Sequence, residues 1–306
     1  MDVFSLISEA SAVSATDFIA LLEKAIDLLG QESGRIGNFS VNGRLVTHEP
    51  LGEALVIGDL HGDLESLRSI LHQSQFLEKI EQFKNTAIIF LGDYGDRGPN
   101  SAEVYYIVLS LKLAFPQQVV LLRGNHEAPR DLIGSPHDLP FQFRSRFGEG
   151  WKQTYERMWV LFSCLYNAVY VGERYLMVHG GVSPLISSLR DIAQAQEDHN
   201  EAVLEDLLWS DPNDDLQGVS ASPRGAGKLF GKDVTEKILA DVNAKVLIRG
   251  HEASDEGFKI NHGGKVLTLF SRRGAPYYNR FGAYLELPLA EKFGDASELA
   301  SCIRKF

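Results

Sequence analysis

Between residues 54 and 122, the chain alternates between two hydrophobic patterns. Uninterrupted hydrophobic runs lie at 54–57, 87–91 and 119–122, and runs of this length are typical of strands that are buried on both faces. After the first two runs, hydrophobic residues recur at every third or fourth position, which predicts amphipathic helices that start at Asp63 and near Asn100. The order strand, helix, strand, helix, strand predicts a parallel sheet of the α/β class.

The first 45 residues have a helical pattern of their own. Hydrophobic residues recur at helical spacing from Phe18 to Leu29, and no linker, internal repeat or low-complexity segment follows. We therefore expect a helical extension over 1–45, packed on one large domain over 46–306. The residues predicted to bound this helix are Thr16 and Asp17 at its start and Gly30 and Gly34 at its end.

The second half of the chain is richer in strand patterns. An acidic helix is predicted over 192–208 and a long polar loop over 211–228. Trp151, Tyr155 and Trp159 recur every four residues and predict one packed helix face, with a binding platform as the alternative. The predicted strands are a hairpin of 168–171 and 175–178, followed by 246–248, 266–270 and 283–287.

Composition narrows the classes of protein. The 306 residues are 44% hydrophobic and carry a net charge of −11, which fits a globular chain and argues against a general nucleic-acid binder. Cys164 and Cys302 are the two cysteines, so neither a disulfide framework nor a Cys-rich zinc site is expected. The longest mostly hydrophobic stretch, 159–171, is shorter than the about 20 residues that span a bilayer. We expect a cytoplasmic protein with no membrane or nucleic-acid partner.

Side chains that bind metals follow five of the predicted strands. A single Gly-Asp after a strand is usually a turn, and a single His is usually structural. Five such strand ends, however, point to one shared site, because ligands of open α/β sheets collect at the carboxyl ends of strands. The candidate residues are Asp59, His61, Asp93, Asn125, His126, His179 and His251.

Three of these segments read GDLHG at 58–62, GDYGDRG at 92–98 and GNHE at 124–127. They resemble the GDxHG, GDxxDRG and GNHE motifs of the phosphoprotein phosphatases, which are metal-dependent serine/threonine phosphatases. The resemblance covers about residues 50–290 in family order and continues through 179–184, 209–212, 223–225, 249–251 and 270–271. It implies the calcineurin-like metallophosphoesterase fold, a central β-sandwich of two mixed sheets flanked by helices.

The resemblance also implies two divalent metal ions. Oxygen and nitrogen ligands without sulfur suit manganese, our first expectation, and also iron or zinc. Two such ions would activate a shared water for direct attack on phosphorus. By resemblance, Asp59, His61 and Asp93 would bind one ion, and Asp93, Asn125, His179 and His251 would bind the other.

The remaining family positions imply roles in catalysis and phosphate binding. His126 would protonate the leaving alkoxide, with Asp96 orienting its imidazole. Arg97 and Arg224 would bind the phosphate oxygens, because guanidinium groups match their geometry. Tyr278 would overhang the site. A purely structural role is the alternative at each position.

Departures from the family pattern predict a divergent member, such as a prokaryotic one. Gly95 replaces the usual valine, Asn279 replaces an expected cysteine, and 128–131 is an unusual continuation of the third motif. Inhibitor sensitivity and regulatory subunits are left open by these changes.

Three functions were weighed. We expect a phosphatase acting on phosphoserine or phosphothreonine proteins, with phosphotyrosine as a further substrate. The motifs at 209–212 and 223–225 favour this over a diadenosine polyphosphate or nucleotide hydrolase of the same fold. The complete ligand set, together with His126 and Asp96, argues against a catalytically silent phosphate-binding scaffold.

Overall fold

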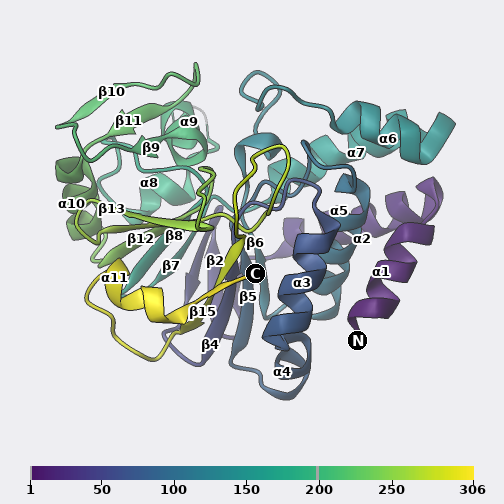
Figure 1. The fold of residues 1–306 in the computed structure, drawn as a ribbon, viewed down its shortest axis with the longest axis horizontal. Coiled ribbons are helices and arrows are strands. Elements are labelled where there is room, and N and C mark those ends of the chain that lie inside the picture. Colours follow the sequence, from purple (N-terminus) through teal and green to yellow (C-terminus); the bar gives the residue numbers. More distant parts are fainter. Residues whose placement is uncertain (1, 198–199) are drawn as a thin grey trace.

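Two mixed β-sheets flanked by helices form the body of the molecule (Figure 1), as the sequence predicted. The computed structural model describes residues 2–197 and 200–306. The larger sheet has the order β1-β2-β3-β7-β8-β12-β14-β13. Its strands are β1 (Gly34–Ile36), β2 (Phe39–Asn42), β3 (Leu45–His48), β7 (Ala168–Val171), β8 (Tyr175–Val178), β12 (Val246–Arg249), β13 (Phe258–Asn261) and β14 (Val266–Leu269).

The second sheet has the order β16-β15-β4-β5-β6 and contains the predicted βαβαβ unit. Its three strands from that unit run parallel, and all but Glu53 of their residues are buried, so hydrophobic side chains point to both faces. The strands are β4 (Glu53–Ile57), β5 (Thr86–Phe90), β6 (Val119–Leu121), β15 (Ala283–Pro288) and β16 (Ile303–Lys305). The unit's helices are α3 (Leu64–Ser74), α4 (Phe76–Gln82) and α5 (Ser101–Ala114).

The larger sheet separates two hydrophobic cores. In β8, Tyr175 and Met177 belong to the core shared with the smaller sheet, whereas Leu176 and Val178 belong to the core beneath the helices on the other face. This alternation follows from the two-residue repeat of a strand. The two strands β7 and β8 form the predicted hairpin. The remaining helices are α6 (Leu139–Phe147), α7 (Trp151–Cys164), α8 (Leu189–Ala193), α9 (Glu201–Trp209), α10 (Lys232–Asp241) and α11 (Ala296–Leu299).

The N-terminal segment contains more than the single predicted helix. Helices α1 (Val3–Ala12) and α2 (Ala15–Gln31) lie beside α5 at the outer edge of the molecule (Figure 1), and the strands β1 and β2 follow. Ser14 caps α2 by accepting the N–H of Asp17, so the predicted cap was misplaced within the first turn. Gly30 lies inside the helix, where an added Cβ would meet no neighbouring atom within 4 Å outside the helix backbone. The division into 1–45 and 46–306 stays a prediction.

Two predictions for the second half of the chain were wrong. The helix expected over 192–208 is two helices, α8 and α9, because a capping box between Ser188 and Asp191 starts the first and hydrogen-bonded turns follow it. Residues 198–199 of that prediction lie outside the described residues. The polar loop expected over 211–228 contributes to a small sheet of β9 (Asp211–Pro212), β10 (Val219–Ala221) and β11 (Lys228–Phe230). Its strands are too short and polar to produce a hydrophobic pattern.

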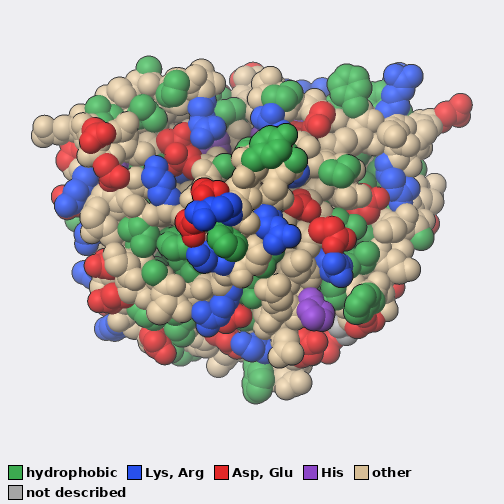
Figure 2. Space-filling view, in the orientation of Figure 1, with side chains coloured by type: hydrophobic (Ala, Val, Ile, Leu, Met, Phe, Trp, Pro, Cys, Tyr) green, Lys and Arg blue, Asp and Glu red, His purple; other side chains and the backbone are tan. Residues whose placement is uncertain are grey.

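Surface and helix properties add two observations. Acidic and basic side chains are interspersed on the face shown in Figure 2, so the net charge is not gathered into one patch there.

Among residues 2–197 and 200–306, each helix is too short or too polar to cross a bilayer. The hydrophobic stretch 159–171 instead forms the end of α7 and the strand β7.

A buried ion pair joins the N-terminal helices to the body. The Lys112 ammonium on α5 donates to Oε1 of Glu32, directly after α2, at 2.7 Å and to the carbonyl of Val119 at 3.0 Å. The side chains of Lys112 and Glu32 are 0% and 4% exposed. The second Glu32 oxygen accepts from the hydroxyl of Tyr166.

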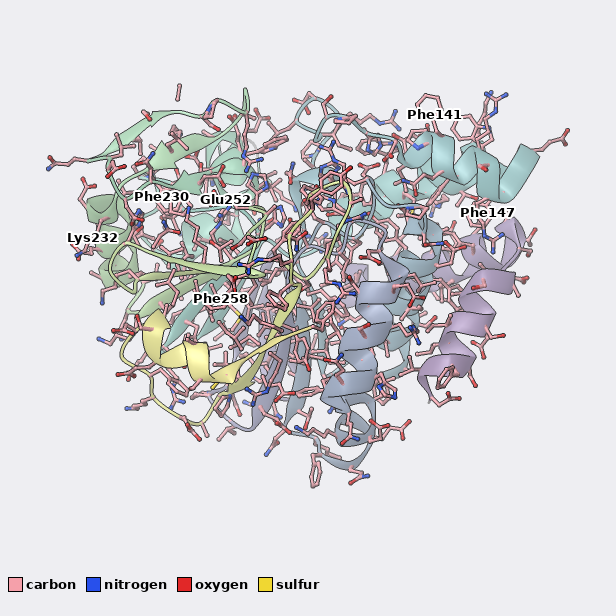
Figure 3. All side chains as sticks on the ribbon, in the orientation of Figure 1. Phe141, Phe147, Phe230, Lys232, Glu252 and Phe258 are labelled. Carbon is pink, nitrogen blue, oxygen red and sulfur yellow. The ribbon has the colours of Figure 1, made fainter. Side chains whose placement is uncertain are left out.

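Lys112→Met is expected to lower the free energy of unfolding by about 3–5 kcal/mol, because it leaves the Glu32 carboxylate buried without its cation. Lys232→Met is the matched control on the exposed edge of α10 (Figure 3), where the pair with Glu236 is open to water. It should change stability by less than about 1 kcal/mol. Urea denaturation measures both, and equal effects of the two variants would contradict the structural role of the buried pair.

Candidate active site

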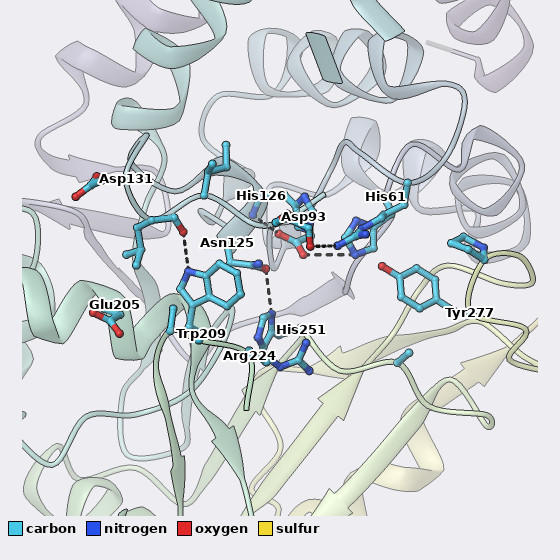
Figure 4. A pocket seen from close by; sticks show the side chains of 18 residues that line it. His61, Asp93, Asn125, His126, Asp131, Glu205, Trp209, Arg224, His251 and Tyr277 are labelled. Atoms are coloured by element: carbon cyan, nitrogen blue, oxygen red, sulfur yellow. Dashed lines mark hydrogen bonds and ion pairs between the residues drawn. The ribbon is translucent and has the colours of Figure 1, made fainter. Parts of the chain in front are cut away.

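The structure brings together the side chains that follow β4, β5, β6, β8 and β12. They meet beside a cavity of about 790 Å³ at the carboxyl ends of these strands (Figure 4). Five of the seven side chains line it, whereas Asp59 and His179 do not. Asp59 and His61 follow β4, Asp93 follows β5, Asn125 and His126 follow β6, His179 follows β8 and His251 follows β12. All seven are buried, which is unusual for so many polar groups.

Asp93 is common to two groups of potential metal ligands. Its Oδ2 lies 3.5 Å from Nε2 of His61, and its Oδ1 lies 3.4 Å from Nε2 of His179. On the first side, Oδ2 of Asp59 lies 3.7 Å from the same His61 nitrogen. The two Asp93 oxygens therefore face different imidazoles, so this carboxylate would contribute to both groups of ligands.

Backbone carbonyls fix the orientation of two histidines. Nδ1 of His61 lies 3.1 Å from the carbonyl of Gly95, and Nδ1 of His179 lies 2.9 Å from that of Leu91. A ring that donates from Nδ1 to a carbonyl presents the lone pair of Nε2 to the site, as metal-binding histidines commonly do. Both Nε2 atoms consequently point at Asp93.

These groups fit divalent cations. Oδ1 of Asn125 lies 3.0 Å from both Nε2 of His179 and Nδ1 of His251, so three atoms with lone pairs converge. Oδ2 of Asp59 is buried with no hydrogen-bond partner. Such an excess of acceptors is satisfied by cations or, at Asn125, by exchanging the amide oxygen and nitrogen. The donor set of oxygen and nitrogen suits manganese, iron or zinc.

The pKa values of these buried side chains also indicate that the site has more acceptor groups than positive charge. Burial raises the pKa of Asp59 to about 7 and lowers the pKa of His61 to about 3. At His179, burial opposes protonation, but the Asp93 carboxylate outweighs it and raises the pKa to about 9. A proton on His179 thus provides charge that a bound cation would otherwise supply.

Several site residues have backbone angles that side chains rarely adopt. The φ angles are positive at His61, Asp93, Asp96, Arg97 and His251, with values from 45° to 72°. Hydrogen bonds fix these conformations. For example, the N–H of His251 donates to Oδ1 of Asp59 at 2.8 Å, and that of Asp96 to the hydroxyl of Ser101 at 3.0 Å. Contacts within the protein therefore support these loop conformations.

Glu127 connects the second and third loops, a role that the sequence analysis did not assign. Its carboxylate is fully buried and accepts the N–H groups of Asp93 at 2.9 Å, Tyr94 at 3.1 Å and Gly124 at 3.1 Å. The hydroxyl of Tyr105 donates to it at 2.6 Å. The place of Glu127 in the GNHE motif could have marked it as a candidate residue. Only the fold shows that its carboxylate reaches the loop of Asp93 and Tyr94.

His126 and Asp96 form a close pair at the edge of the cavity. Nδ1 of His126 lies 2.6 Å from Oδ2 of Asp96, and both side chains are buried. Burial alone would raise the pKa of Asp96, but hydrogen bonds from imidazoles lower it, so the carboxylate is ionised. A Cβ at Gly134 would lie 2.8 Å from Nε2 of His126, so the missing side chain leaves room beside that nitrogen.

Two arginines line the cavity on different elements. Arg97 follows the second loop and donates from Nη2 to the carbonyl of Ser135 at 2.9 Å. Arg224 lies near the small sheet and donates from Nε to Oδ2 of Asp211 at 2.6 Å. Trp209 also lines the cavity, with its ring edge-on to His251 at 5.7 Å.

The structure corrects the expectation for Tyr278. Its side chain is 80% exposed and does not line the cavity, whereas the preceding Tyr277 does (Figure 4). Tyr277 stacks on His61 with ring centroids 5.4 Å apart. Both residues lie in a turn in which their N–H groups donate to Gly274, and Tyr278 has a φ of 59°. Because successive side chains in this turn point in different directions, Tyr277 reaches the cavity and Tyr278, one position later, points to solvent.

Comparison with known proteins identifies the family to which the chain belongs. The sequence model described as calcineurin-like phosphoesterase matches residues 53–255. The chain belongs to the calcineurin-like phosphoesterase family. Within it, the chain is 34% identical over 281 residues to the serine/threonine-protein phosphatase 6 catalytic subunit of Caenorhabditis elegans, covering 89% of this chain and 75% of that one. This similarity assigns it to the serine/threonine-phosphatase branch of the family.

A further relative supports this assignment, and a solved structure supports the fold. A probable serine/threonine-protein phosphatase of Encephalitozoon cuniculi is 36% identical over 83% of this phosphoesterase chain, which spans 54% of that relative's length. A Saccharomyces cerevisiae phosphatase structure, described as similar to human phosphatase PP5, matches with a TM-score of 0.67 at 24% identity. The match covers 90% of this chain and 82% of the yeast chain, and it confirms the fold expected from the sequence.

Metal content should depend on Asp93 more than on any other ligand. We expect the wild-type chain to bind two divalent ions, Asp59→Asn to keep one, and Asp93→Asn to lose both, because Asp93 faces both expected groups of ligands. Asp131→Asn is the control, since this exposed carboxylate lies in the cavity wall away from the shared cluster. Elemental analysis after manganese loading measures the stoichiometry, and two ions retained in Asp93→Asn would rule out a bridging role.

Proposed function

We propose that this chain hydrolyses phosphoserine and phosphothreonine in proteins by direct attack of water on phosphorus, with no phosphoenzyme. The observation that carries the proposal is the close His126–Asp96 pair beside two ligand groups that share Asp93. This arrangement provides a proton donor next to a site for two cations. Manganese is the metal we expect, with iron or zinc as alternatives.

The proposed ligands divide between the two ions. Asp59, His61 and Asp93 would hold one, and Asp93, Asn125, His179 and His251 the other. When bound there, two divalent cations supply a water of lowered pKa and neutralise charge on the phosphoryl oxygens. The protein's contribution is to bury and orient these ligands in loops whose backbone is already fixed.

His126 is the proposed general acid. The carboxylate of Asp96 accepts from Nδ1, so Nε2 is the nitrogen that can carry the transferable proton. Burial by itself lowers the pKa of His126, but Asp93 and Asp96 raise it overall. In the reaction the bond from water oxygen to phosphorus forms, the bond from phosphorus to the serine or threonine oxygen breaks, and that oxygen takes the proton of His126.

Arg97 and Arg224 are the proposed phosphate ligands. Each is partly occupied by a backbone carbonyl or by Asp211, and these contacts hold the side chains in the cavity wall with the remaining N–H groups available. Guanidinium groups on two sides suit a phosphate with several anionic oxygens. Tyr277, rather than Tyr278, is the tyrosine that we now propose beside the substrate.

The proposed setting is that of an intracellular phosphatase. Cytoplasmic location, the absence of nucleic-acid and membrane partners, and the identity of any regulatory subunit stay predictions.

Substrate preference tests the proposal directly. With manganese added, the chain should hydrolyse phosphoserine and phosphothreonine peptides with a higher kcat/KM than a phosphotyrosine peptide or diadenosine tetraphosphate. Phosphate release measures the peptides, and chromatography measures the dinucleotide. A preference for the dinucleotide would replace protein dephosphorylation with nucleotide hydrolysis, and no turnover of any of the four would support a silent scaffold.

His126→Asn should lower kcat on a phosphoserine peptide by about 100- to 10,000-fold, because the departing alkoxide would lose its proton donor. Metal content should stay at the wild-type level, since His126 is not among the proposed ligands. Steady-state kinetics and elemental analysis of the same preparation check both parts. Unchanged kcat would remove the general-acid assignment, and lost metal would show that the residue acts as a ligand.

A further inference from the structure

A second histidine contacts the carboxylate that orients His126. Nδ1 of His137 lies 2.7 Å from Oδ2 of Asp96, the same oxygen that lies 2.6 Å from Nδ1 of His126. The other oxygen accepts the N–H groups of Asp138 at 3.0 Å and Leu139 at 2.7 Å. Four donors thus converge on one buried carboxylate, and three of them come from the segment 137–139.

The His137 ring is itself held from the side away from Asp96. Its Nε2 lies 2.8 Å from the hydroxyl of Tyr155 on α7, and its ring packs near Trp159 with centroids 6.0 Å apart. Burial raises the pKa of Tyr155 to about 12, so the phenol keeps its proton near neutral pH. The hydroxyl can therefore donate to Nε2, which leaves the ring proton of His137 on Nδ1, facing Asp96.

The same segment also positions Arg97. The N–H of Arg97 donates to Oδ1 of Asp138 at 3.0 Å, and its Nη2 donates to the carbonyl of Ser135. Arg97 has a φ of 68°, a conformation that needs such support. The segment 135–139 therefore contacts both the orienting carboxylate and a proposed phosphate ligand.

We propose that His137 is a positioning residue for the His126 general acid, acting through Asp96 and held in place by Tyr155. The proposal rests on the proposed phosphatase function. His137 prevents the Asp96 carboxylate from rotating away from His126. As an additional donor to the same oxygen, it holds that carboxylate where it accepts from Nδ1 of His126.

The choice of leaving group separates this role from a structural one. A serine alkoxide needs a proton as it departs, whereas p-nitrophenolate is stable enough to leave without one. A residue that serves the general acid should therefore matter for a phosphoserine peptide and much less for p-nitrophenyl phosphate. A residue that only supports the fold or Arg97 should affect both substrates equally.

His137→Phe is expected to lower kcat on the phosphoserine peptide about 10- to 100-fold, with KM unchanged. Its kcat on p-nitrophenyl phosphate should fall less than about threefold. His137→Asn should recover much of the lost activity, because its amide nitrogen can occupy the place of Nδ1 and donate to Asp96. Tyr155→Phe should show the same leaving-group dependence more weakly, and it tests the proposal independently if His137→Phe does not fold.

Two controls complete the experiment. Trp151→Phe changes an aromatic residue one turn before Tyr155 on α7 and should behave as wild type. Adding His137→Phe to His126→Asn should cause no further loss on the peptide, because the acid it positions is already absent. Equal losses on both substrates, no loss on the peptide, or an additional loss in the double variant would overturn the proposal. Failure of the wild-type chain to hydrolyse either substrate would instead overturn the proposed function.

Discussion

The buried carboxylate of Asp93 sets the central constraint on this protein. A fully buried anion is unfavourable unless positive charge or hydrogen-bond donors surround it, and the fold provides both. His61 and His179 face its two oxygens, and the N–H of His126 donates to one of them. The same arrangement places Asp93 between two groups of ligands, so one buried carboxylate would serve both ions of the proposed site.

The scaffold around Asp93 is correspondingly rigid. The parallel strands β4, β5 and β6 are almost entirely buried, and their loops start from fixed positions at one edge of the sheet. Glu127 bonds the second loop to the third, and a side chain at Gly124 would collide with Asp93. Positive φ angles at the ligands store local strain that these contacts offset. These contacts hold the candidate ligands in one arrangement, and such fixed polar groups are what electrostatic catalysis requires.

The region beside the ligands has a different organisation. Asp96 receives hydrogen bonds from His126 on one side and from the segment 137–139 on the other, and α7 supports that segment through Tyr155. The aromatic face of α7, predicted as a packed helix face, thus contacts a residue next to the site. Its packing role and its proximity to the chemistry are compatible, because the partly buried Trp159 packs on the core and also against the His137 ring.

The sequence by itself predicted the βαβαβ unit and the candidate residues at the strand ends, because hydrophobic period and motif spacing are local properties of the chain. The pairing of His126 with Asp96 followed from the resemblance to a known family. Local patterns could not place the cap of α2, the short strands β9 to β11, or the break between α8 and α9. They also could not show that Tyr277 rather than Tyr278 enters the cavity, or that Glu127 and His137 reach loops 34 and 41 residues away. Only the tertiary structure decided the positions of Tyr277, Glu127 and His137, because each depends on which way a side chain points after distant segments have packed together.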